Sequence, residues 1–418
     1  MTDSKMFNRA VSIATVLLFL TSAHPVFSQS APGSSVQATR PRARSLGIHP
    51  GIYEPGKLNA ITDVKGVRVG QVTRVEGENV RTGVTAIFPT PDNPFKNKLA
   101  AAIVVGNGFG KLIGFTQVNE LGEMETPIVL TNTLSVWTAA DAVVDYMLSL
   151  PGNEDVRSIN PIVGETNDGY LNDIRGRHIL KQDVLEALRS AKDGPLEEGS
   201  VGAGAGTVAF QWKGGIGTSS RLLPRGESRY TLGALVQTNF GGHLTIDGVP
   251  IWQELKPQAA IRQPSQPGSP TKVPAPTTIS ESVSSADGSC MIVLATDAPL
   301  DARQLTRLAR RAFAGMARTG STFSNGSGDY VIAFSTAPEF LSASGKASIT
   351  ARVTLHDDDL SPFFEAAEDA TEEAIYNSLL QAATVHGRDG HVAEAIPIGA
   401  LNHILNKFGR GSEQPLDH

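Results

Sequence analysis

The sequence is poor in cysteine and in aromatic residues, and it carries no strong charge of either sign. Cys290 is the only thiol among 418 residues, so no disulfide can form within the chain. It begins an apolar run, and we expect its thiol to be buried and inert. A net charge of −6 gives no electrostatic basis for nucleic-acid binding. Because 40% of the residues are apolar, stability is expected to come from a buried core or from assembly.

The sequence also lacks the motifs of metal and cofactor enzymes. Its nine histidines include no pair at i and i+4, and no His-Glu-x-x-His segment occurs. A Gly-x-Ser-x-Gly nucleophile elbow is absent, and the glycines of 202–206 lack the spacing of a dinucleotide-binding loop. The acidic run at 357–359 can bind a cation but is more typical of a solvated turn before a helix. We therefore expect no metal and no cofactor.

The N-terminal residues have the pattern of a secretory signal peptide. Lys5 and Arg9 precede an apolar run at 11–20, which is too short to span a bilayer comfortably. We predict a signal peptide at 1–28, followed by a disordered mature segment at 29–45. The mature protein is expected to be periplasmic or secreted, with no membrane segment. Retention of the N-terminal run as an anchor is the alternative.

The dipeptide Gly288–Ser289 is the strongest candidate for chemistry. Gly-Ser occurs seven times in the chain and is usually part of a turn. This copy lies between a proline-rich stretch at 256–278, which predicts an exposed loop, and an apolar run at 290–294, which is typical of a buried strand. A scissile bond at this step would therefore border an accessible segment.

Self-cleavage at this step would create a catalytic N-terminus. The Ser289 hydroxyl can attack the Gly288 carbonyl, and hydrolysis of the resulting ester leaves Ser289 with a free α-amine. That amine has a pKa of about 7.7–8.0 and can act as general base for its own hydroxyl. Glycine suits the preceding position because it tolerates backbone angles that a side chain forbids. We therefore predict that Ser289 is a nucleophile that the chain produces by cutting itself.

The spacing of apolar residues predicts strands and helices in alternation. Strands are expected at 64–72, 100–105, 127–131, 202–206, 230–238, 290–295, 330–334 and 346–355. Helices are expected at 136–150, 301–318 and 361–382. This order predicts an α/β protein with its strands and helices in layers.

The strand, helix and strand after Gly288 most simply form a crossover with parallel strands. Both strands then begin at one edge of the sheet. Ser327 and Asp329, which precede the second strand, would therefore lie near Ser289. Ser327 could orient Ser289 or relay its proton, and Asp329 could hold Ser327 or the new α-amine. An ordinary turn is the alternative for 325–329.

Runs of residues along nearly the whole mature chain match a known family. They lie at 61–70, 83–86, 131–133, 164–173, 213–221, 235–241, 287–289, 292–300, 318–320 and 325–329. These runs resemble the family of L-aminopeptidase/D-amidase/D-esterase and β-peptidyl aminopeptidases. Because they are long and numerous, the resemblance is highly specific.

The resemblance implies an N-terminal-nucleophile-like hydrolase, an αββα sandwich of two mixed sheets flanked by helices. Autocleavage would divide it into an α chain at 46–288 and a β chain at 289–418, which together form one domain. The proline-rich loop then looks like an insertion. The family also implies small peptide or amino-acid amide substrates and a homo-oligomer of αβ heterodimers.

The same resemblance implies roles for six residues. It makes Ser289 the nucleophile and places Ser327 and Asp329 in its proton network. Asn239 would contribute to the oxyanion hole. Two further residues are implied by the family alone and would contact the substrate. Glu165 would bind the free amino group of the substrate, and Tyr170 would line the same pocket.

Two other functions remain open on the sequence. The first is an acyl transferase of the same fold, similar to ornithine acetyltransferase, with acyl transfer in place of hydrolysis. That distant relative uses threonine at the cut, so Ser289 argues against this function. The other is a non-catalytic exported binding protein that retains the fold. The acid at Asp329 can be glutamate in β-aminopeptidases, so the choice between α- and β-peptides also stays open.

Overall fold

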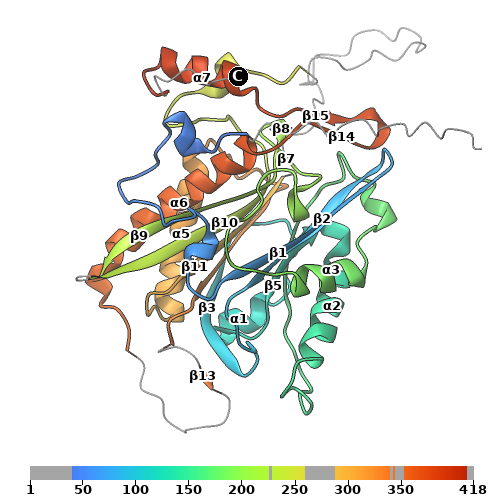
Figure 1. The fold of residues 1–418 in the computed structure, drawn as a ribbon, viewed down its shortest axis with the longest axis vertical. Coiled ribbons are helices and arrows are strands. Elements are labelled where there is room, and N and C mark those ends of the chain that lie inside the picture. The colour runs from blue at the N-terminus through green and yellow to red at the C-terminus, as the bar shows by residue number, and fades with distance from the viewer. Residues whose placement is uncertain (1–39, 226–227, 259–287, 339–341, 344–352, 412–418) are drawn as a thin grey trace, which may run out of the picture. The chain divides into compact units, whose positions relative to one another are not determined.

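Two mixed β-sheets face each other in this structure, which is a computed structural model. It describes residues 40–225, 228–258, 288–338, 342–343 and 353–411. The predicted signal peptide, residues 29–39 and most of the proline-rich loop lie outside the described residues. From Arg40 onward the described chain forms one unit. Figure 1 shows how its elements are arranged.

The larger sheet has the strand order β13-β3-β12-β11-β10-β9, and β4 pairs with β3 as well. Its strands are β3 (Asn97–Gly108), β4 (Glu123–Met124), β9 (Ile216–Arg225), β10 (Ser228–Asn239), β11 (Ser289–Thr296), β12 (Gly328–Ser335) and β13 (Ser342–Ala343). The smaller sheet has the order β1-β2-β5-β6. Its strands are β1 (Arg68–Glu76), β2 (Val80–Phe88), β5 (Ile128–Asn132) and β6 (Ile162–Thr166). Only β11–β12 and β5–β6 are parallel among these described pairs, so both sheets are mixed.

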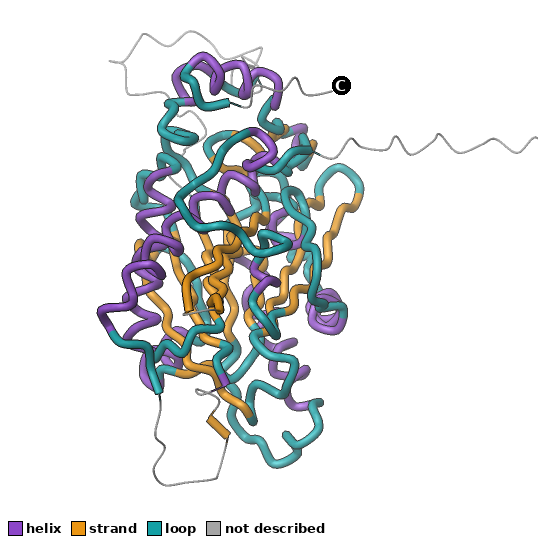
Figure 2. The backbone as a smooth tube through the Cα atoms, turned by 60° about the vertical axis from the view of Figure 1, so that its left-hand side comes forward, coloured by secondary structure: helices purple, strands orange, loops and turns teal. Residues whose placement is uncertain are grey.

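Helices cover the outer face of each sheet. The described α-helices are α1 (Phe115–Leu121), α2 (Val136–Leu148), α3 (Lys181–Arg189), α4 (Ile251–Glu254), α5 (Ala302–Arg318), α6 (Ser361–Leu380) and α7 (Ile398–Lys407). Helices α5 and α6 pack on the larger sheet, and α2 and α3 pack on the smaller one. Two short hairpins, β7 (Val208–Ala209) with β8 (Trp212–Lys213) and β14 (Val385–His386) with β15 (Val392–Ala393), complete the described strands. Figure 2 shows the strands lying between helices.

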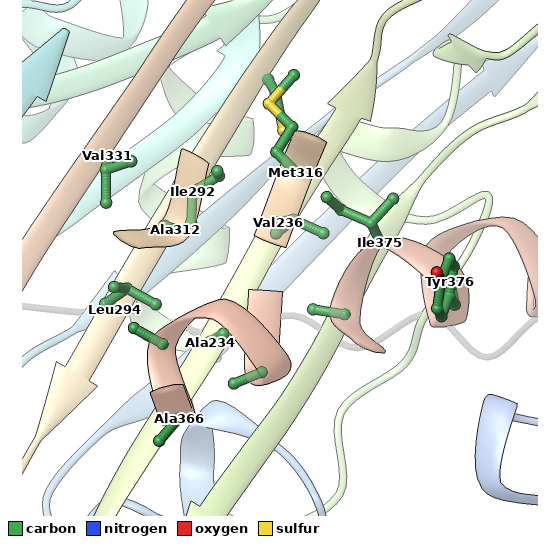
Figure 3. Close-up of a cluster of buried hydrophobic side chains, with 14 of the residues drawn as sticks. Ala234, Val236, Ile292, Leu294, Ala312, Met316, Val331, Ala366, Ile375 and Tyr376 are labelled. Atoms are coloured by element: carbon green, nitrogen blue, oxygen red, sulfur yellow. The ribbon is translucent and has the colours of Figure 1, made fainter. Parts of the chain in front are cut away.

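Three apolar layers hold these elements together. Along β11, Ile292 and Leu294 point toward α5 and α6, whereas Met291 and Val293 point toward the smaller sheet. Side chains alternate along a strand, so a strand that is buried on both faces has a continuous apolar run. Figure 3 shows the layer beneath the helices, with side chains from β10, β11, β12, α5 and α6. A third layer joins the smaller sheet to α2 and α3. The predicted αββα sandwich is confirmed.

The crossover that follows the predicted cut is also confirmed. Asp301 caps α5 by accepting a hydrogen bond from the backbone N–H of Gln304 at 2.7 Å. The helix returns the chain so that β11 and β12 run parallel, with Ser289 opposite Gly328. Both strands therefore begin at the same edge of the larger sheet.

Three sequence predictions need correction. Residues 202–206 form no strand, because Gly202–Gly204 is a 3-10 turn. The expected close backbone contact is present, since a Cβ on Gly204 would lie 2.5 Å from the Ile216 nitrogen. Residues 40–45 were expected to be disordered, but Arg40 donates hydrogen bonds of 2.6 Å to the carbonyls of Leu380 and Ile396. The strand expected at 346–355 falls largely outside the described residues, and 353–355 form no strand.

A fully buried ion pair joins the larger sheet to α6. Arg221 of β9 and Glu373 of α6 are both 0% exposed, and their Nη2 and Oε2 atoms are 2.8 Å apart. Glu373 also accepts hydrogen bonds from Arg44 and Asn59, so the N-terminal segment is tied to the same carboxylate. Removal of one partner from such a pair leaves a buried charge without compensation.

We predict that Glu373→Gln lowers the free energy of unfolding by about 3–5 kcal/mol, because the Arg221 charge stays buried without its counterion. Urea unfolding followed by circular dichroism measures the loss. The matched control is Glu368→Gln on the same helix, whose partner Arg318 is 47% exposed; this change should cost less than about 1 kcal/mol. Equal losses in the two variants would contradict the prediction.

Candidate active site

Ser289 is the first residue of β11 and is only 6% exposed. Its Oγ accepts a hydrogen bond of 3.2 Å from the backbone N–H of Gly328. The same N–H donates to the Gly288 carbonyl oxygen at 3.1 Å. One backbone donor therefore faces both the predicted nucleophile and the carbonyl that it would attack.

Side chains are excluded on both sides of this contact. A Cβ on Gly288 would lie 2.4 Å from the Phe240 Cα and 2.6 Å from the Asn239 carbonyl oxygen. A Cβ on Gly328 would lie 3.1 Å from the Ser289 Oγ and 2.8 Å from the Gly110 Cα. Glycine is needed at both positions because of this close approach.

Ser327 and Asp329, which are predicted to belong to the proton network, contact each other. The Ser327 Oγ donates a hydrogen bond of 2.8 Å to the Asp329 Oδ1, and both side chains are buried. Burial raises the pKa of Asp329 to about 6, although the Ser327 hydroxyl and the Cys290 backbone N–H favour the carboxylate. The second carboxyl oxygen has no hydrogen-bond partner among the described residues. This carboxylate can therefore accept a proton near neutral pH.

Asn239 lies beside Ser289 on the antiparallel neighbour strand. It is the last residue of β10 and is the register partner of Ser289, so the two side chains leave the same face of the sheet. Its Oδ1 accepts a hydrogen bond of 2.9 Å from the Val208 N–H. Because the oxygen is used in this bond, the Nδ2 end of the amide is the end that can donate to a reacting carbonyl.

Alternation along the strands places this face between the two sheets. Ser289 and Met291 leave the same face of β11, and Met291 packs against Gly164 of β6 in the smaller sheet. Cys290 points the other way, into the layer beneath α5 and α6, where burial raises the pKa of its thiol well above the ordinary value. The cysteine is accordingly placed as an apolar core residue.

Glu165 reaches the site from β6. It is 2% exposed, its Oε1 accepts a hydrogen bond of 2.9 Å from the Lys111 N–H, and its Oε2 accepts one from the Thr133 hydroxyl. A Cβ on Gly110 would lie 3.3 Å from the Glu165 Oε1 and 3.2 Å from the Gly328 Cα. A single glycine therefore separates the Glu165 carboxylate from the residue that contacts Ser289.

Charge and burial act on Glu165 in opposite directions. Burial raises its pKa, whereas the Thr133 hydrogen bond and Lys111 lower it. The Lys111 Nζ is 3.9 Å from the Glu165 Oε1, and its side chain is 44% exposed. Glu165 is thus a buried carboxyl group that two donors hold in place close to the Lys111 ammonium.

Tyr170 is not joined to this cluster by a described contact. Its ring stacks on His391 with centroids 4.5 Å apart, and its carbonyl lies 2.7 Å from the His391 Nδ1. The structure thus brings five of the six predicted residues to one edge of the sheets, and the roles of all six stay predictions. The sequence did not predict a role for Gly110, Lys111 or Thr133, whereas the glycines around Ser327, which include Gly328, were expected to expose backbone N–H groups.

The described residues contain no group of three or more His, Cys, Asp or Glu side chains placed to hold a metal ion. Within the same ranges, no helix is both long and apolar enough to cross a bilayer.

Comparisons with known proteins identify the family. Residues 59–393 match the family model described as peptidase family S58. The chain is 41% identical over 388 residues to β-peptidyl aminopeptidase BapA of Sphingosinicella microcystinivorans, covering 90% of this chain and 94% of that protein. The resemblance inferred from the sequence is confirmed.

Solved structures agree as well. The L-aminopeptidase D-Ala-esterase/amidase of Ochrobactrum anthropi, described as a prototype of the serine aminopeptidases with a variant Ntn hydrolase fold, matches with a TM-score of 0.78. The two are 36% identical, and the match covers 89% of this chain and 100% of that one. A β-aminopeptidase of a Burkholderia species matches with a TM-score of 0.76 and 37% identity, covering 90% of this chain and 100% of that one. The N-terminal-nucleophile-like fold class is confirmed.

We predict that the Asp329 carboxyl titrates with a pKa of about 6 in the folded protein. As the pH falls through this value the carboxylate is protonated, and its capacity to accept the Ser327 proton is lost. Carbon-13 NMR titration measures the pKa, with Asp329→Asn to assign the resonance. Ser327→Ala should raise the pKa further, since the lost hydrogen bond favours the carboxylate. A pKa near the ordinary 3.8 would contradict this account.

Proposed function

The chain belongs to peptidase family S58 and is a hydrolase of the aminopeptidase type, and from that premise we propose that it is a self-processing serine aminopeptidase or amidase that acts through Ser289. The observation that carries the proposal is the single N–H of Gly328, which donates both to the Ser289 Oγ and to the Gly288 carbonyl oxygen. Its substrates would be small peptides or amino-acid amides with a free N-terminus.

The first reaction would be a cut in the chain itself. The Ser289 Oγ attacks the Gly288 carbonyl carbon, and the Gly328 N–H stabilises the charge that develops on the oxygen. The Ser289 hydroxyl gives up its proton, the C–N bond of Gly288–Ser289 breaks, the Ser289 nitrogen takes up that proton and an ester forms. Water then hydrolyses the ester, so that Gly288 ends the α chain and Ser289 begins the β chain.

The second reaction would repeat this attack on a substrate. The new α-amine, with a pKa of about 7.7–8.0, can accept the Oγ proton, and the Ser327–Asp329 pair can take part in its transfer. Asn239 and the Gly328 N–H would donate to the substrate oxyanion. The leaving amine departs with a proton, and water hydrolyses the Ser289 ester to release the N-terminal residue.

The position of Glu165 supports the removal of one residue at a time. A substrate ammonium is recognised by charge and hydrogen bonds, and Glu165 offers a buried carboxylate just beyond Gly110. That short separation suits a substrate whose amino group and scissile carbonyl belong to the same residue. Two of the compared relatives are named as β-aminopeptidases, so amides of β-amino acids belong in the substrate panel beside L- and D-amino-acid amides.

We further propose that residues 1–28 direct export and are removed from the mature protein, which assembles from several αβ pairs. The first part is supported by the basic and apolar pattern at 5–20. Size-exclusion chromatography with light scattering of the mature protein measures the assembly.

We predict that Ser289→Ala abolishes both self-cleavage and amidase activity, because the same hydroxyl performs both attacks. A denaturing gel should change from two bands to one, and hydrolysis of amino-acid p-nitroanilides should fall by more than about 10³-fold. The matched control is Ser321→Ala, which removes the hydroxyl of another Gly-Ser dipeptide and should leave both properties intact. Robust hydrolysis by the Ser289 variant would overturn the mechanism, and a single uncut band in the unaltered protein would favour a non-catalytic role.

We predict that Glu165→Gln lowers kcat/KM by about 10–100-fold for substrates with a free amine, since the ammonium loses its charged partner. Esters of N-acetylated residues carry no ammonium, and their kcat/KM should change less than about threefold. Glu125→Gln is the control, because Glu125 is also a buried carboxylate paired with a lysine, at 2.6 Å, but has no contact with this site. Equal losses on free and acetylated substrates would contradict the role of Glu165.

A further inference from the structure

A strained hairpin lies behind Asn239. Strands β7 and β8 are joined by Phe210 and Gln211, whose φ angles are +52° and +69°. Two-residue turns with positive φ at both positions normally use glycine or asparagine, because other side chains are disfavoured there. Such a conformation persists only where the surrounding structure holds it, and it is often found where geometry matters for function.

A buried lysine helps to keep the β7–β8 hairpin in this conformation. Lys213 is 0% exposed, and its Nζ donates hydrogen bonds of 2.8 Å to the Gly204 carbonyl and 2.7 Å to the Gly214 carbonyl. These two carbonyls lie near the two ends of the hairpin segment 204–214, so one amine closes the segment into a ring.

The two hydrogen bonds do not depend on the charge of the lysine. Burial lowers the pKa of Lys213 to about 7, although the nearby Asp168 opposes the shift. An ammonium has three N–H donors and a neutral amine has two. Because only two carbonyls need a donor, both forms of the side chain can make both bonds.

The closed segment contacts the end of β10 at three successive residues. Val208 is the register partner of Lys213, and its N–H donates to the Asn239 Oδ1 at 2.9 Å. The Phe210 N–H donates to the Phe240 carbonyl at 2.8 Å. Gly214 lies so close to the Thr238 carbonyl oxygen that a Cβ on it would be 2.5 Å away.

We propose that Lys213 is a positioning residue for the reaction at Ser289. By closing the segment 204–214 it fixes the Val208 N–H, which in turn holds the Asn239 amide with its NH₂ end toward the reacting carbonyl. This inference rests on the proposed role of Asn239 as an oxyanion donor. An asparagine amide can rotate by half a turn at little steric cost, and the rotated amide would present an oxygen lone pair to the developing oxyanion. The Val208 hydrogen bond opposes that rotation because an N–H cannot donate to the amide NH₂.

The test is a double-mutant cycle of Lys213→Met and Asn239→Ala. Rates are normalised to the number of Ser289 N-termini, counted by N-terminal sequencing, so that incomplete self-cleavage does not enter kcat. Asn239→Ala alone should lower kcat about 10²–10³-fold. Lys213→Met alone should lower kcat at least about tenfold with KM within about twofold, since the amide is misoriented in part of the molecules.

The decisive measurement is the effect of Lys213→Met in the Asn239→Ala background. If Lys213 acts through Asn239, its replacement there should change kcat less than about twofold. The full loss in both backgrounds, or an unchanged kcat in the single variant, would overturn the inference. An unchanged kcat in Asn239→Ala would instead remove the proposed oxyanion role, and this inference with it.

Two further variants control for folding. Lys213→Gln replaces the amine with a neutral group that still has two N–H donors, and it should recover most of the kcat lost in Lys213→Met. If Lys213→Met does not fold, Lys213→Gln enters the same cycle, and any kcat loss it causes must vanish in the Asn239→Ala background. Lys181→Met removes an exposed lysine on α3 and should leave kcat unchanged.

Discussion

The parallel pairing of β11 with β12 is the contact on which the rest of the site depends. It sets Ser289 opposite Gly328, so the N–H at the start of β12 reaches the Ser289 hydroxyl and the carbonyl before it. The antiparallel strand β10 ends where β11 begins, so Asn239 lies beside Ser289 at the same edge of the sheet. A one-residue slip of β11 would turn Ser289 toward the helices and bring the Cys290 thiol into its place. The register is fixed because both faces of β11 are packed in different apolar layers.

Burial acts on the ionisable groups of the site in one consistent way. Exclusion from water disfavours charge, so it raises the pKa of Asp329 and Glu165 and lowers the pKa of Lys213. Each group then has a partner suited to its position. Ser327 donates to Asp329, Thr133 and the Lys111 N–H donate to Glu165, and two carbonyls accept from Lys213. Burial thereby moves the pKa of Asp329 to about 6 and that of Lys213 to about 7.

The sequence could predict the part of the site that one strand–helix–strand unit supplies, namely Ser289, Ser327 and Asp329. One strand, one helix and a second strand imply a parallel crossover, and that rule alone placed Ser327 and Asp329 at the same sheet edge as Ser289. Asn239 and Glu165 were available only through the family resemblance, because no periodicity tells which distant strand ends beside β11. Lys213 was missed for a related reason. Its carbonyl partners are Gly204 and Gly214, and Gly204 lies in the run 202–206, which is predicted to be a strand but forms a 3-10 turn.

Three glycines, which have no side chain, shape the site as much as its functional groups do. Gly288, Gly328 and Gly110 follow one another between Phe240 and Glu165, and each leaves no space for a Cβ. Backbone atoms can therefore approach the Ser289 hydroxyl from both sides, where their N–H and C=O groups take part directly. A larger residue at any of the three would separate strands that must touch for the Gly328 N–H to reach its two acceptors. The same close packing that excludes side chains thus aligns hydroxyl, carbonyl and donor before any substrate arrives, which is the preorganisation that attack on a carbonyl requires.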